Sequence, residues 1–229
     1  MFNIAFELEG IKSQEKIELL ANSQKYMGML LLEGKGNTPL TSNAALRGAA
    51  MLACTPSLAK IAEGKENTFK VATQVLDNLQ DLAYEIERGG MARNPKPDVL
   101  GTLSEISVLA SIYWSIANGY FDGNSYAVLT NTKRDRSEHN GLRNRVDIIF
   151  KQGNSKHLIQ VKSSRGISAK SYAPGIKVIT PTDLSEARFN KTAHPNKILS
   201  YIRTGNSLKL DSVAMRILAI FPTQKNVDI

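Results

Sequence analysis

The chain of 229 residues has only one cysteine, Cys54, and three histidines. A single cysteine cannot form an intrachain disulfide, and it excludes zinc sites built from several cysteines. The histidines, at positions 139, 157 and 194, have spacings that match no zinc-ligand pattern. Cys54 lies in an apolar stretch of small residues, which favours a buried hydrophobic role over a nucleophilic Cys/His pair.

Long apolar runs and an N-terminal basic segment are also missing. The longest nearly unbroken apolar run, around residues 26–32, is far shorter than the roughly 20 residues that span a bilayer. Glu7 and Glu9 stand where a secretory signal would carry basic residues, and no small-residue cleavage site follows a hydrophobic stretch. We therefore expect a cytoplasmic protein with no membrane segment. The 42% of hydrophobic residues is ordinary for a globular protein.

Charge is distributed unevenly along the chain. Residues 1–100 contain 11 Lys and Arg against 12 Asp and Glu, whereas residues 101–229 contain 18 against 9. The formal net charge of +8 therefore arises in the second half. Such asymmetry favours a polyanionic partner for that half, most often nucleic acid and less often an anionic membrane. The alternative is a basic face that serves only solubility.

The hydrophobic pattern changes from helical to strand-like along the chain. Apolar residues spaced three and four apart predict helices at 17–31 and 69–86, with a small-residue helix at 42–53. The glycines and prolines of 88–98 predict a linker, followed by a helix from about 103 to 118 that ends at Gly119. Strand patterns follow at 126–130, 146–150, 158–161 and 213–221, and a pair of helices is expected at 184–191 and 196–205.

These elements predict an α/β fold in two parts. Residues 96–229 are expected to form a mixed β-sheet flanked by helices. Residues 1–95 are expected to form a helical N-terminal region that assists recognition or dimerisation. Amphipathic helices of this kind pack cores more often than they indicate a function.

Residues 143–164 predict a β-hairpin that carries polar groups in apolar strands. A turn centred between Gly153 and Asn154 pairs Asp147 with Gln160, and strand alternation places Lys162 on the same face. Charged groups inside such strands are usually paired or bound to a metal. The alternative is an ion pair between Asp147 and Lys162 on a solvent-exposed face, with Gln160 beside it.

A second acid, Glu105, stands near the start of the helix predicted at 103–118. The first turn of a helix that precedes a sheet can point at the edge where such strand residues meet. The alternative is a capping box, because Thr102 and Glu105 have the spacing in which Glu bonds back to the N-cap residue.

The ordered set Glu105, Asp147, Gln160 and Lys162 resembles the PD-(D/E)xK nuclease superfamily, in the variant whose last acid is replaced by Gln. Gly119-Tyr120, Val146-Asp147-Ile148 and Ile159-Gln160-Val161-Lys162 are similar to segments of the Mrr-like restriction endonuclease domain, and similar QVK sites occur among Type II restriction enzymes. The resemblance covers about residues 100–220. The chain departs from the family pattern at Val146, where Pro is usual, and at Gln160, where a third acid is usual.

The resemblance implies a restriction-endonuclease-like fold and a metal-dependent endonuclease that hydrolyses DNA in a restriction or defence system. Glu105, Asp147, Gln160 and Lys162 would be its catalytic residues. Mg²⁺, or Mn²⁺ in its place, would be held by Asp147, the Val161 carbonyl and Glu105, while Lys162 would position water and help to deprotonate it. Because Gln160 is a weaker ligand than Glu, a second metal is expected to be weakly held or absent.

Duplex DNA is the expected partner, and basic residues on both sides of the hairpin are the expected contacts with its phosphates. Each could instead be a solvated surface charge. They are Arg134, Arg143, Arg145, Arg165 and Lys170.

Cutting both strands usually needs two active sites, so a homodimer is expected, with a cognate methyltransferase as a further partner in a restriction system. Three alternatives stay open. One is a non-catalytic nucleic-acid-binding protein on a decayed nuclease fold. Another is a nuclease for branched DNA or RNA, and the third is a structural assembly protein.

Overall fold

The computed structural model of the protein describes residues 43–54, 56–57, 69–88, 97–129, 146–162, 175–179 and 217–224. The helices expected at 17–31, 184–191 and 196–205 lie outside these residues. The division of the chain at residue 95 stays a prediction.

Three helices are described. The small-residue helix and the amphipathic helix predicted from the sequence are confirmed as α3 (Asn43–Ala53) and α5 (Phe69–Arg88). The next helix, α6 (Pro97–Ala117), begins earlier than predicted, and its first two residues had been assigned to the linker. The reason is that proline is well tolerated in the first turn of a helix, where its missing N–H has no partner to lose.

The end of α6 was predicted correctly at Gly119. This glycine has a φ of 73°, in the left-handed region that favours glycine. The N–H of Gly119 donates to the Ile116 carbonyl and that of Tyr120 to the Ser115 carbonyl, both at 2.9 Å. These two bonds form a Schellman motif, a helix C-cap with a left-handed glycine in which the last carbonyls of the helix accept hydrogen bonds. They turn the chain back toward the sheet.

The sheet is mixed, as predicted, and its four strands follow the order of the chain. Strands β1 (Tyr126–Leu129), β2 (Ile148–Gln152) and β3 (Ser155–Val161) are antiparallel neighbours, and β4 (Ile176–Ile179) pairs parallel to β3. The turn between β2 and β3 consists of Gly153, with a φ of 54°, and Asn154, so the predicted register is confirmed. Strand β4 was not predicted.

The strand predicted at 213–221 is not observed at residues 217–221, the part of this range that the structure describes. Residues 217–220 form a helical turn, and the N–H of Phe221 donates to the Ile217 carbonyl at 3.0 Å. A short apolar run does not distinguish a strand from a buried helical turn. The buried residues Ile217, Leu218 and Phe221 have helical spacing, and the Phe221 ring packs edge-on against Phe150 of β2.

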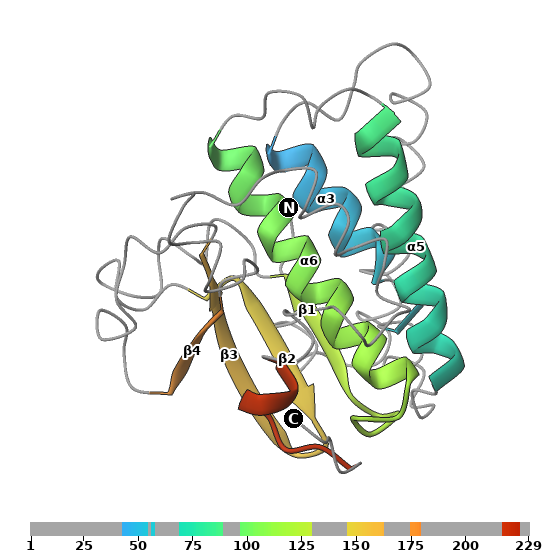
Figure 1. Cartoon of the computed structure of the whole chain (residues 1–229), viewed down its shortest axis with the longest axis vertical. Coiled ribbons are helices and arrows are strands. Elements are labelled where there is room, and N and C mark those ends of the chain that lie inside the picture. Colours follow the sequence, from blue (N-terminus) through green and yellow to red (C-terminus); the bar gives the residue numbers. More distant parts are fainter. Residues whose placement is uncertain are drawn as a thin grey trace, which may run out of the picture.

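Helix α6 connects the other helices to the sheet. It contacts β1 and β3, while α3 and α5 pack against it, so that the three helices form one layer beside the sheet (Figure 1). The Tyr113 hydroxyl donates to the Ala127 carbonyl at 2.9 Å, which fixes α6 on β1. Buried residues from all three helices and all four strands belong to one hydrophobic cluster.

Residues Val99–Ala117 of α6 are long and apolar enough to cross a membrane, but 94% of this stretch is buried inside the protein. Its polar residues are mainly serines, whose hydroxyls donate to carbonyls of the preceding turn at 2.8 to 2.9 Å. Such bonds allow serine to be buried without a lost hydrogen bond. Glu105 is the one charged residue in the stretch.

Cys54 follows α3 and is completely buried, so we predict that its thiol is inert in the folded protein. Burial raises the pKa of the Cys54 thiol to about 12, and the thiolate is the reactive form. A thiol reagent such as Ellman's reagent at pH 8 should not modify the native protein, but should modify one thiol per chain in guanidinium chloride. Fast modification of the native protein would contradict the packing of α3 against α6.

Candidate functional site

One edge of the sheet gathers the candidate residues. Pairing of Leu129 with Ile148, Ile148 with Ile159 and Val161 with Ile179 brings the ends of β1, β3 and β4 to the edge where β2 begins (Figure 1). Asp147 immediately precedes β2 at this edge, and Gln160 and Val161 lie in the last residues of β3. The topology therefore brings the hairpin residues singled out from the sequence to one place.

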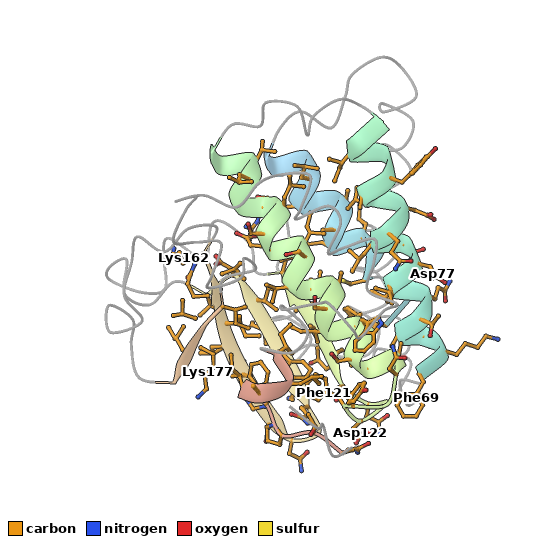
Figure 2. All side chains as sticks on the ribbon, in the orientation of Figure 1. Phe69, Asp77, Phe121, Asp122, Lys162 and Lys177 are labelled. Carbon is orange, nitrogen blue, oxygen red and sulfur yellow. The ribbon has the colours of Figure 1, made fainter. Side chains whose placement is uncertain are left out.

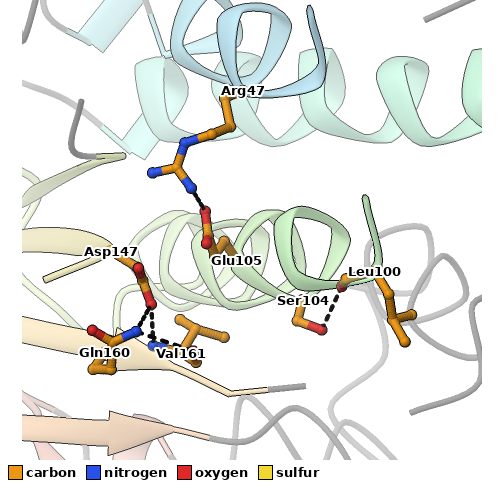
Figure 3. Close-up of polar contacts among 7 residues, drawn as sticks. All are labelled: Arg47, Leu100, Ser104, Glu105, Asp147, Gln160 and Val161. Carbon is orange, nitrogen blue, oxygen red and sulfur yellow. Dashed lines mark hydrogen bonds and ion pairs between the residues drawn. The ribbon is translucent and has the colours of Figure 1, made fainter. Parts of the chain in front are cut away.

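Asp147 has a buried carboxylate, with the residue only 5% exposed. Its Oδ2 accepts the backbone N–H of Val161 at 2.7 Å and a hydrogen bond from the Gln160 amide (Figure 3). Its own N–H donates to the Ile159 carbonyl at 2.9 Å, one residue out of the register in which Ile148 pairs with Ile159. The backbone thus holds the carboxylate in one position, and donors to the charged form reduce the free-energy cost of burying it.

Gln160 is 2% exposed, and its side chain bonds to Asp147 just beyond the last β2–β3 pair, Ile148 with Ile159. Its Nε2 donates to Asp147 Oδ2 and lies 3.3 Å from the Val161 carbonyl oxygen. Its Oε1 is buried and has no hydrogen-bond partner among the residues that the structure describes. A buried amide oxygen without a donor is uncommon and indicates a missing partner.

The burial of Asp147 and Gln160 corrects one alternative. An ion pair on a solvent-exposed strand face was an open interpretation of the hairpin, but both residues are inside the protein. Lys162 is only partly buried, directly after β3, and its N–H donates to the Ile179 carbonyl at 2.9 Å. Figure 2 shows Lys162 at the edge of the sheet, with Asp77 of α5 on the opposite side of the molecule.

Glu105 does not cap a helix, and its ion pair is with Arg47 of α3 rather than with a residue of the strands. It lies inside α6, which begins at Pro97, so the capping-box alternative is wrong. Its Oε2 accepts a hydrogen bond from Nη1 of Arg47, and the two residues are 8% and 5% exposed. In Figure 3, the carboxylate of Glu105 is directed to Arg47, and no hydrogen bond or ion pair is drawn between Glu105 and Asp147.

Arg47 of α3 is the residue at this site that was missed. It is the only charged residue of its helix, in the sequence NAALRGAAMLA. Helix α3 is otherwise apolar and small, so a charge in it must find a partner in the core. That isolated charge, together with the isolated Glu105 of α6, was the available signal.

The oxygen atoms around Asp147 are of the kind that bind a hard cation. Within the described ranges, no three His, Cys, Asp or Glu side chains form a group that could hold a metal ion. The oxygens of Asp147 and of the Val161 carbonyl nevertheless both face the Gln160 Nε2, a positively polarised atom. A half-turn of the amide would put Oε1 there instead, and the three oxygens would then be ligands of the kind that a hard cation prefers. The unpartnered Oε1 is the observation that favours this arrangement.

The predicted phosphate contacts, Arg134, Arg143, Arg145, Arg165 and Lys170, lie outside the described residues. They are close in sequence to the candidate site residues. Arg145 directly precedes Val146, and the segment 163–174 directly follows Lys162. Segments 130–145 and 163–174 together contain seven Lys and Arg and two Asp and Glu.

Comparison of the chain with family models, curated proteins and solved structures finds no protein family, no curated protein and no solved structure that matches it.

Proposed function

We propose that the protein is a metal-dependent endonuclease that hydrolyses DNA phosphodiester bonds at the edge formed by Asp147, Gln160 and Lys162, in a restriction or defence role. The observation that carries the proposal is the buried carboxylate of Asp147 facing an amide whose Oε1 has no partner among the described residues. The mixed sheet flanked by helices is compatible with a restriction-endonuclease-like fold. The basic segments that flank the edge in the chain support a polyanionic substrate.

Each residue has a definite task in this proposal. Asp147, the Gln160 amide oxygen and the Val161 carbonyl would hold a divalent cation, Mg²⁺ or Mn²⁺. When bound, the cation supplies a Lewis acid that polarises the phosphate and lowers the pKa of water. Lys162, next to Val161 and partly exposed, would orient the attacking water or offset charge on the phosphate. The basic segments would orient the duplex without specifying its sequence.

One observation favours a second candidate, a nucleic-acid-binding protein without catalysis. The negative charge of Glu105 is paired with Arg47, and the site has an amide at Gln160 in place of an acid. The described site therefore holds less negative charge than a site with three acids. A protein of this kind would bind DNA with strong salt dependence and would need no divalent cation.

Plasmid cleavage with matched lysine variants tests the proposal. We expect the wild-type protein to nick or linearise supercoiled DNA with Mg²⁺ or Mn²⁺ and not with EDTA. Lys162→Met should lower the rate by about 10²-fold or more, because it removes the positive charge at the phosphate. Lys70→Met, at an exposed position of α5, should leave the rate unchanged.

The alternatives give different results in the same assay. Salt-dependent DNA binding with no cleavage under any divalent cation would support the second candidate. Cleavage of a four-way junction or of RNA, with duplex DNA left intact, would keep the chemistry and change the substrate. Absence of both binding and cleavage would contradict both candidates.

Gln160→Glu provides a separate test of the cation site. The substitution places a second carboxylate against Asp147, where the amide now donates a hydrogen bond. Two buried carboxylates repel each other unless a proton or a cation lies between them. We expect the variant to have a lower Tm than wild type in EDTA and a larger Tm increase with Mn²⁺, measured by differential scanning fluorimetry. Equal Mn²⁺-induced shifts in both proteins would argue against a cation at this position.

A further inference from the structure

The NH₂ group of Gln160 lies against two of the oxygens that the proposed cation would need. Its Nε2 donates to Asp147 Oδ2 and lies 3.3 Å from the Val161 carbonyl oxygen (Figure 3). An ionised carboxylate and a backbone carbonyl can only accept hydrogen bonds, so they select the nitrogen end of the amide. This orientation excludes a cation from the same point, because the positively polarised NH₂ group would repel it.

The amide of Gln160 can turn without any rearrangement around it. The residue is 2% exposed, so there is little room for a larger movement. The last side-chain torsion of glutamine is broad and roughly two-fold, and the nitrogen and oxygen of an amide are nearly the same size. A half-turn therefore exchanges the two atoms in place. Glutamate at this position could not act in this way, since both of its ends would be oxygens.

The outer end of the amide does little to fix its orientation. Oε1 is buried, and no donor among the described residues bonds to it. Within that part of the chain, the hydrogen bonds that hold the Gln160 amide run to Asp147 and to the Val161 carbonyl. The preference for one orientation is therefore decided at the point where a cation would bind.

We propose that the Gln160 amide is a two-position gate on the cation site. With Nε2 inward, it closes the point between the Asp147 carboxylate and the Val161 carbonyl; with Oε1 inward, it becomes a ligand. The second position rests on the proposed function, whereas the first stands on the contacts described. The closed position keeps a buried carboxylate hydrogen-bonded without any metal, so folding should not require a cation. Binding must shift the amide to the open position, which lowers the apparent affinity.

Side-chain amide NMR of the ¹⁵N-labelled full chain tests the gate without any variant of Gln160. Its NH₂ signals are assigned through their bonds to its own backbone. In EDTA we expect one NH₂ proton shifted downfield by its bond to the Asp147 carboxylate. Mg²⁺, which is diamagnetic, should move this signal upfield, because the bond breaks when the amide turns. The matched control is Gln152, whose Nε2 donates to the Pro222 carbonyl at 2.6 Å and whose signals should stay in place.

The Mg²⁺-induced increase in Tm of wild type and of Asp147→Asn, measured in parallel, separates the gate from the cation site. An increase that only wild type shows, with the Gln160 signals still at their EDTA positions, would overturn the gate and keep the site. The same increase with the Gln160 signals moved would support the gate. Moved signals without plasmid cleavage would support the gate and contradict the endonuclease. Neither a Tm increase nor a moved signal in wild type would overturn both the gate and the site.

Discussion

Asp147→Asn is expected to lower the rate of DNA cleavage by roughly three orders of magnitude, because a lost metal ligand removes several kcal/mol of transition-state stabilisation. Asparagine keeps the shape of the side chain, and its amide oxygen can still accept the Val161 N–H that Asp147 Oδ2 accepts at 2.7 Å. It loses the negative charge that would hold the cation. The rate of plasmid nicking with Mg²⁺ measures the effect.

The matched control is Asp77→Asn, because Asp77 is an exposed residue of α5 far from the edge of the sheet (Figure 2). It should cleave at the wild-type rate. Both variants should unfold with similar urea midpoints. Wild-type cleavage by a folded Asp147→Asn protein would exclude Asp147 as a ligand and, with it, the proposed site.

Asp147→Ala would be a poorer probe of the same site. It leaves the Val161 N–H and the Gln160 amide without the acceptor that both now use. Each buried donor left unsatisfied costs about 1–3 kcal/mol, which could unfold a marginally stable domain and mimic a loss of activity. The asparagine variant separates the charge from the hydrogen bonds.

The hairpin could be predicted from the sequence because two local signals agree there. The Gly153-Asn154 pair favours a tight turn, and the apolar strands on both sides leave one register that buries their side chains. With the turn located, counting along the two strands places Asp147 close to Gln160. That both residues are buried did not follow, because burial depends on layers packed over the strands.

Elements without an unambiguous local signal were predicted less well. The early start of α6 at Pro97 depends on a proline that is compatible with either a linker or a first helical turn. The apolar run at 217–220 fits a strand or a helical turn equally well. Among the described strands, β4 pairs with β3 alone, and this parallel pairing is a non-local contact.

The Arg47–Glu105 pair was the largest omission at the site, and physical reasoning could have found it. Both residues stand alone as charges in apolar helices, and a lone charge in a buried helix requires a partner. Arg and Glu are complementary in sign. A separation of 58 residues hides such a pair from any local pattern. Isolated charges in apolar helices are therefore worth matching across a whole chain.

Glu105→Leu is expected to lower the free energy of unfolding by about 3–5 kcal/mol, because it removes the carboxylate that balances the buried charge of the Arg47 guanidinium. Total stabilities of single domains are about 5–15 kcal/mol, so this is a large share. Urea denaturation at constant m-value measures the loss. The loss concerns folding alone and is independent of any bound metal. It therefore tests the packing of α3 on α6 whatever the protein does.

The companion variant is Arg47→Met/Glu105→Leu, in which both charges are replaced by apolar side chains. Its stability should return to within about 1–2 kcal/mol of wild type, since replacing a whole buried ion pair is often neutral. Equal stability of wild type and Glu105→Leu would mean that water already solvates the pair, which the burial of both residues contradicts. If the double variant also cleaves DNA, the chemistry does not require Glu105 as a metal ligand. Among the candidate carboxylates of the described residues, Asp147 would then be the one that can still hold the cation.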